Sequence, residues 1–128
     1  ATHIQPLIND EQFEAITWIA TNTEPDSYVL ATSYDAPWVL GWANRKVIAP
    51  GLFQWDKYNQ SEWINFLRTD DMEMAKEFLG RYEPPIYIYY SKNWGNYLNL
   101  KKFENDYFEK VYDKGAVIYR YSGGTKVI

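Results

Sequence analysis

Apolar and polar positions follow two patterns along this chain, one typical of helices and one typical of strands. Residues 10–21 and 61–79 place apolar side chains at helical spacing. Residues 28–32 and 86–90 are short apolar runs bounded by turn residues, which indicates buried strands. The apolar face expected for the first helix carries Phe13, Ile16, Thr17 and Ala20.

Capping and turn residues predict where the middle elements begin and end. Asp35 is placed to cap a short helix that has Pro37 in its first turn and ends near Ala43. Asn44 can take the left-handed conformation that terminates a helix, and residues 46–49 read as a second strand.

Capping and turn residues also predict the elements in the second half of the chain. Thr69 is expected to cap a helical piece over residues 70–79, and a short helix is expected over residues 98–104. Residues 107–121 alternate as two strands joined by the turn at 113–115, which is typical of a hairpin.

The order of these elements predicts the fold class. Strands separated by helical crossovers imply an α/β fold: a single three-layer domain with a mainly parallel sheet, helices on both faces and a C-terminal antiparallel β-hairpin. We assign residues 1–121 to this domain and expect residues 122–128 to form a flexible tail. A chain of 128 residues fits one domain.

Charge and composition exclude several classes of function. The formal net charge is -4 and basic residues occur at most in pairs, which argues against a nucleic-acid partner. The chain has no cysteine, and its only histidine is His3. Thiolate metal sites, zinc-protease motifs and serine triads therefore lack their residues, and no glycine-rich phosphate loop follows a strand. We expect no metal and no cofactor.

Aromatic residues make up 19% of the chain. Rings with a polar tip suit half-buried surfaces such as sugar-binding grooves and protein interfaces, but they also pack cores. The tryptophans considered for a sugar-stacking platform, with packing as the alternative, are Trp38, Trp42, Trp55 and Trp94.

Two carboxylates follow predicted strands. Asp35 and Asp56 would lie in loops at the carboxyl edge of the sheet, where α/β proteins usually bind ligands. Asp35 has the alternative interpretation of a helix cap, and nothing in the spacing brings the two residues together.

The segment EQFEAITWIATNTEPDSYVLATSYDAPWVLGWANRKVIAPG resembles the start of the extracytoplasmic C-terminal domain of prokaryotic, especially archaeal, polytopic membrane glycosyltransferases of the GT-C class. The closing YFEKVYDKGAVIYRY is similar to the terminal hairpin of such domains. The matching elements are Glu11 to Ile19, Asn22 to Ser27, Tyr28 to Thr32, and Trp38 to Arg45.

Within that class, residues 33–37 distantly resemble the WWDYG region of oligosaccharyltransferases, which helps to hold the acceptor sequon. This chain keeps only an aromatic residue before Asp35. The resemblance implies a non-catalytic fragment of an integral membrane enzyme that uses a lipid-linked sugar donor. Its partners would be the membrane-embedded remainder of the parent chain and a glycan or protein acceptor, at the extracytoplasmic face of the membrane. The candidate substrate-binding residues are Tyr34, Asp35, Trp38, Arg45, Trp55 and Asp56.

Two other classes of function remain open from the sequence. A free-standing carbohydrate- or protein-binding module would use the aromatic loops. A small soluble hydrolase would use a pair of carboxylates.

Overall fold

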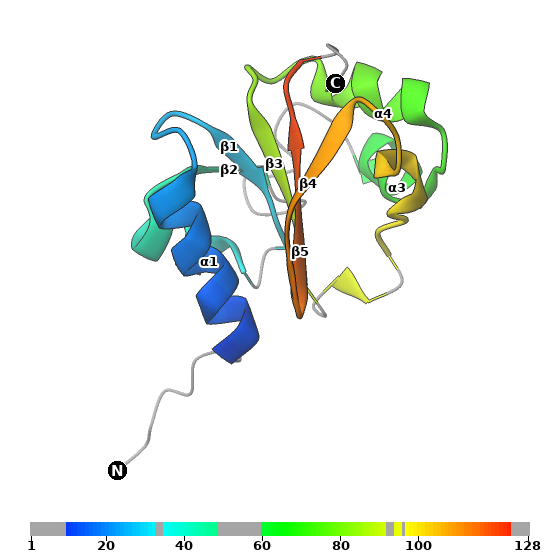
Figure 1. The fold of residues 1–128 in the computed structure, drawn as a ribbon. Coiled ribbons are helices and arrows are strands. Elements are labelled where there is room, and N and C mark those ends of the chain that lie inside the picture. Colours follow the sequence, from blue (N-terminus) through cyan, green and yellow to red (C-terminus); the bar gives the residue numbers. More distant parts are fainter. Residues whose placement is uncertain (1–9, 33–34, 49–59, 92–93, 96, 124–128) are drawn as a thin grey trace.

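Five strands form one sheet in the computed structural model, in the order β2-β1-β3-β5-β4 (Figure 1). The strands are β1 (Tyr28–Leu30), β2 (Lys46–Ile48), β3 (Ile86–Tyr90), β4 (Phe108–Lys114) and β5 (Ala116–Tyr121). β1 pairs in parallel with β2 and β3, whereas β5 pairs antiparallel with β3 and β4. The C-terminal hairpin is confirmed, but the sheet is mixed rather than mainly parallel, because β5 forms both of its pairs in the antiparallel sense.

The structure describes residues 10–32, 35–48, 60–91, 94–95 and 97–123. They form a single α/β domain with four α-helices and two short helices of other types. The helical elements are α1 (Asp10–Asn22), α2 (Ala36–Trp38), the π-helix η1 (Val39–Ala43), α3 (Gln60–Arg68), α4 (Met72–Leu79) and the 3-10 helix η3 (Lys101–Phe103). The helix expected over residues 98–104 is thus a single 3-10 turn.

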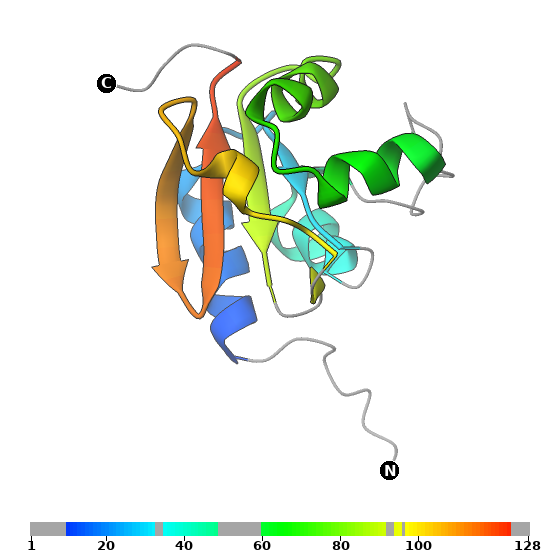
Figure 2. The ribbon, with the colours of Figure 1, turned by 90° about the vertical axis from the view of Figure 1, so that its right-hand side faces the viewer.

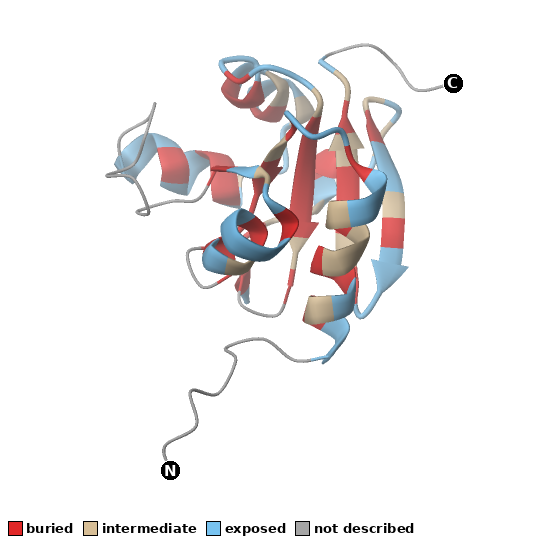
Figure 3. Cartoon of the chain, turned by 90° about the vertical axis from the view of Figure 1, so that its left-hand side faces the viewer, coloured by how far each residue is buried: buried red, intermediate tan, exposed pale blue. Residues whose placement is uncertain are grey.

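Helices cover both faces of the sheet (Figure 2). α1, α2 and η1 pack on one face, and α3, α4 and η3 pack on the other. The strand IYIYY serves both faces, since Ile86 and Ile88 point to the α3–α4 side whereas Tyr87 and Tyr89 point to the α1 side. Buried positions accordingly follow the strands and the sheet-facing sides of the helices (Figure 3).

The buried side of α1 is rotated from the expected one. Its buried residues are Gln12, Ala15, Ile16 and Ile19. Phe13 and Thr17 are only half-buried because they contact a neighbouring helix instead of the sheet. The Phe13 ring lies 5.0 Å from that of Trp42, whose indole N–H donates to the Thr17 hydroxyl at 3.2 Å.

The two sides of the core differ in character. On the α3–α4 side, the rings of Phe66 and Phe78 stack with centroids 4.0 Å apart, and the buried Trp63 ring meets Phe78 edge-on at 4.9 Å. The α1 side is built mainly from alanine, valine, isoleucine and tyrosine. Much of the aromatic content is therefore ordinary core packing.

Turn chemistry explains several element ends. Asn44 ends η1 in the left-handed conformation (φ 57°), as predicted, and Gly115 supplies a positive φ of 82° at the hairpin turn. The cap of α4 is Asp71 rather than Thr69, since the Asp71 carboxylate accepts the Glu73 N–H at 2.9 Å.

β2 and β4 are the outer strands of the sheet. β2 has only three residues, and the pairing of β4 with β5 is interrupted by an irregularity between Lys110 and Tyr112. β2 and β4 are therefore the two strands whose outer edges have no partner strand among the described residues.

Candidate functional site

The carboxyl ends of β1 and β3 are neighbours, and the chain leaves them toward opposite faces of the sheet. After β1 it enters α2 and η1 on the α1 side, whereas after β3 it reaches Trp94 and Leu98 on the α3–α4 side. Such a reversal opens a crevice at the carboxyl edge of an α/β sheet, where ligands commonly bind. Residues at this edge are the first candidates for a functional site.

Asp35 joins the two strand exits at this edge. Its Oδ2 atom accepts hydrogen bonds from the hydroxyl of Thr32 at 2.8 Å and from the hydroxyl of Ser91 at 2.7 Å. Asp35 is fully buried, and its two partners are also buried. One carboxylate oxygen therefore holds together the segments that follow β1 and β3, which are 56 residues apart.

The hydrogen bond expected of Asp35 as a helix cap is not formed. The Asp35 backbone is already helical (φ -86°, ψ -23°), and the Ala36 N–H donates to the Thr32 carbonyl at 2.9 Å. A capping residue needs extended backbone to fold its side chain back onto the next turn. Here the chain turns before Asp35, which leaves the carboxylate directed at Ser91.

Two buried tyrosines belong to the same region. No described residue makes a hydrogen bond with the hydroxyl oxygen of Tyr112. The Tyr89 hydroxyl lies close to the Ser91 side chain, which acts on its pKa. Burial raises the pKa of Tyr89, and the negative charge of Asp35 raises it further. Burial also raises the pKa of Tyr112. Both phenols thus remain neutral at physiological pH. They can act as hydrogen-bonding groups but carry no charge.

The other predicted site residues are placed differently. Trp38 is half-buried and meets the Phe13 ring edge-on at 6.0 Å, so it packs α2 against α1. Tyr34, Trp55 and Asp56 lie outside the described residues. Asp35 and Trp38 are therefore the predicted residues that the structure places on one helical segment after β1.

Arg45 lies at the opposite edge of the sheet, because it precedes β2. Its guanidinium donates to the carbonyl oxygens of Ala20 at 3.1 Å and Thr23 at 3.0 Å, and to the Thr23 hydroxyl at 2.8 Å. These acceptors surround the C-terminal end of α1, where carbonyl groups lack partners within the helix. Arg45 thus ties α1 to the start of β2 and does not join Asp35.

Arg45→Met is expected to lower the free energy of unfolding by about 1–2 kcal/mol, because it removes the bonds that complete the end of α1. Lys46→Met, at the exposed neighbouring position, is the matched control and is expected to change little. Chemical denaturation followed by circular dichroism measures both. Equal stability of the two variants would contradict the role assigned to Arg45.

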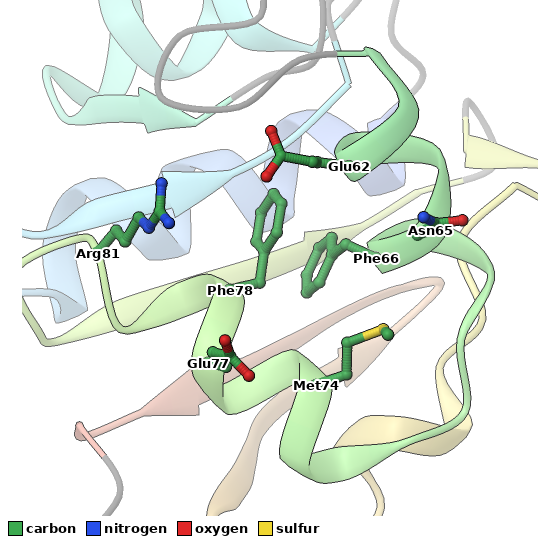
Figure 4. Close-up of a pocket in the computed structure, with 7 residues that line it drawn as sticks. All are labelled: Glu62, Asn65, Phe66, Met74, Glu77, Phe78 and Arg81. Atoms are coloured by element: carbon green, nitrogen blue, oxygen red, sulfur yellow. The ribbon is translucent and has the colours of Figure 1, made fainter.

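A separate hollow of about 220 Å³ opens between α3 and α4 (Figure 4). The stacked rings of Phe66 and Phe78 lie at its centre, with the carboxylates of Glu62 and Glu77 nearby. Its lining consists of Glu62, Asn65, Phe66, Met74, Glu77, Phe78 and Arg81. All of these come from one helix pair and the turn after it, so the hollow does not bring distant segments together as Asp35 does.

Thr32 and Ser91 were missed as site residues by the sequence reasoning. Each is a hydroxyl residue at the end of a predicted buried strand, and that shared position is the signal that could have identified them. Their common partner could not be predicted, because the pairing of β1 with β3 is not encoded locally.

The described residues contain no group of three or more histidine, aspartate and glutamate side chains arranged to hold a metal ion. Among the helices that the structure describes, none combines the length and apolar character needed to cross a membrane. Comparison with protein-family models, curated proteins and solved structures found no match to this chain.

Proposed function

We propose that this chain is the extracytoplasmic, ligand-facing accessory domain of a polytopic membrane glycosyltransferase that uses a lipid-linked sugar donor. In this role it shapes the acceptor side of the enzyme, and the catalytic groups belong to the membrane-embedded remainder of the parent. The proposal combines the sequence resemblance of residues 11–51 and 107–121 with the geometry at the carboxyl edge of the sheet.

The observation that carries the proposal is the buried Asp35 carboxylate between the exits of β1 and β3. A buried carboxylate is costly unless its hydrogen bonds are satisfied, and helix capping does not account for it here. Its hydrogen bonds instead fix the relative positions of the two segments that leave the carboxyl ends of β1 and β3, the edge at which α/β proteins commonly bind ligands. Because Asp35 is fully buried, we assign it a positioning role rather than contact with an acceptor.

The first test is the reading frame that encodes the chain. The proposal requires hydrophobic membrane spans encoded ahead of residue 1 in the parent protein. A frame that begins at residue 1 and encodes no span would contradict it.

The second test is glycosyl transfer by the complete parent protein carrying Asp35→Asn. This substitution preserves shape but removes the negative charge, so we expect a KM for the acceptor raised several-fold with kcat nearly unchanged. The matched control is Asp71→Ala, which removes the cap of α4 at a cost of about 1 kcal/mol and should leave that KM unchanged. Equal acceptor KM values for wild type and Asp35→Asn would contradict the proposal.

A further inference from the structure

A surface hollow of about 650 Å³ lies at the edge of the sheet opposite Asp35, beside the C-terminal end of α1. It is a hollow open to solvent rather than an enclosed cavity. The residues around it come from α1, the turn before β1, and strands β3, β4 and β5. They are Trp18, Thr21, Asn22, Thr23, Glu24, Tyr87, Val111 and Arg120.

Three polar side chains from distant parts of the chain meet in this hollow. The hydroxyl of Tyr87 donates to Glu24 Oε1 at 2.6 Å, and Arg120 Nη2 donates to Glu24 Oε2 at 2.8 Å. Arg120 Nε also donates to the Tyr87 hydroxyl oxygen at 3.1 Å. Tyr87 and Arg120 are direct partners in the β3–β5 register, so the sheet itself sets this geometry.

The charges in this cluster are fixed at physiological pH. Burial alone would raise the pKa of Glu24, but hydrogen bonds from Tyr87 and Arg120 bring it below its ordinary value. Burial and the hydrogen bond to Glu24 raise the pKa of Tyr87 to about 12. Glu24 and Arg120 therefore form a closed ion pair in which the two charges cancel. A charged ligand would have to break this pair, whereas a neutral polar ligand would not.

The cluster retains hydrogen-bonding capacity after its internal bonds are counted. A carboxylate accepts about four hydrogen bonds, and a guanidinium carries five donors. Toward described side chains, Glu24 accepts two hydrogen bonds and Arg120 uses three donors. The exposed amide of Asn22 lies on the same rim, and the half-buried indole of Trp18 supplies an apolar wall.

We propose that this hollow is a saccharide-binding site. A pyranose ring has an apolar C–H face, which suits the Trp18 wall, and a rim of hydroxyl groups that both donate and accept hydrogen bonds. Those hydroxyl groups match the acceptors on Glu24 and the donors on Arg120. The Asn22 Nδ2 already donates to the Trp18 carbonyl at 3.0 Å and to the Thr21 hydroxyl at 3.1 Å, so Asn22 offers its side-chain oxygen as an acceptor. The site shares no residue with the Asp35 cluster and does not depend on the function proposed above.

The test is a titration of the ¹⁵N-labelled chain with methyl α-glucoside, methyl α-mannoside and N-acetylglucosamine, followed by NMR. We expect at least one of them to bind saturably with a millimolar Kd. The indole resonance of Trp18 and the amide resonances of residues 21–24 should shift, whereas the indole resonance of Trp42 should not. Absence of saturable shifts at these positions with all three sugars would overturn the proposal.

Substitutions inside and outside the hollow test whether the sugar binds there. Glu24→Gln removes the charge with little change of shape and is expected to weaken the bound sugar about tenfold, as is typical when a charged hydrogen-bonding group is lost. Trp18→Leu is expected to weaken it similarly. The matched control is Trp42→Leu, which removes another indole on the same side of the sheet, outside the hollow, and should retain the wild-type Kd. If Glu24→Gln is folded by its NMR spectrum and keeps the wild-type Kd, the sugar does not bind in this hollow.

Discussion

Asp35→Ala is expected to lower the free energy of unfolding by about 3 kcal/mol. The substitution removes the oxygen that accepts from the buried hydroxyls of Thr32 and Ser91, and each buried donor left without its acceptor costs about 1–3 kcal/mol. A residue that only capped a helix would cost about 1 kcal/mol. Urea denaturation of wild type and variant, monitored by circular dichroism, measures the difference.

A double-mutant cycle separates this network from a general loss of packing. Ser91→Ala removes one donor, and its effect should be much smaller in the Asp35→Ala background than in wild type, because the bond is already lost. Additive effects of the two substitutions would contradict the network. So would an Asp35→Ala cost as small as that of a helix cap.

Lys102→Met is expected to change stability in a strongly pH-dependent way. Lys102 is fully buried, and its Nζ lies within hydrogen-bonding distance of the carbonyl oxygens of Leu67 and Thr69, both at 3.1 Å, and of that of Asn99. Burial lowers the pKa of Lys102 from its ordinary value of 10.5 to about 7, although the charge of Asp70 acts in the opposite direction. The folded protein therefore resists protonation of this amine.

The sign of the pH effect follows from proton uptake. Between pH 10.5 and about pH 7 the unfolded chain carries a proton on Lys102 that the folded chain does not, so stability falls as pH falls through this window. At about 1.4 kcal/mol per pKa unit, the loss is on the order of 5 kcal/mol. Methionine cannot titrate. We therefore expect Lys102→Met to lower the free energy of unfolding clearly near pH 10.5. Near pH 6 the same substitution should leave that free energy almost unchanged or raise it.

Unfolding free energies of the two proteins, measured across this range, give the difference directly. The matched control is Lys101→Met, the exposed neighbouring position, whose difference from wild type should not vary with pH in this way. Parallel profiles for wild type and Lys102→Met would contradict the depressed pKa of Lys102.

Local signals in the sequence predicted most of the secondary structure. The strand IYIYY, the C-terminal hairpin and the left-handed Asn44 follow from side-chain preferences and turn chemistry, which act over a few residues. The mixed character of the sheet did not follow, because strand order depends on pairings between segments far apart in sequence. The buried side of α1 was also missed, since packing by Trp42 decides that Phe13 faces a helix rather than the sheet.

The candidate site was likewise predicted only where local sequence determines it. Asp35 was identified as a candidate because it follows a buried strand, with a local helix cap as the alternative interpretation. Its partner Ser91 comes from another strand and only the fold brings it close. Arg45 was grouped with Asp35 through the resemblance of residues 38–45, yet the chain crosses from one edge of the sheet to the other between them. The cluster of Glu24, Tyr87 and Arg120 joins positions up to 96 residues apart, which no local pattern reveals.

The outer strands of the sheet also determine how this domain can associate. An unpaired strand edge invites another chain to add a strand, which leads to aggregation. β2 has little backbone to offer because it is three residues long. β4 presents exposed charges at Glu109, Lys110, Asp113 and Lys114, and its irregularity next to Lys110 interrupts a regular ladder. Strand addition is thus disfavoured at both edges, so association of this domain would depend on side-chain contacts with its loops and helices, and the domain should resist fibril formation at high concentration.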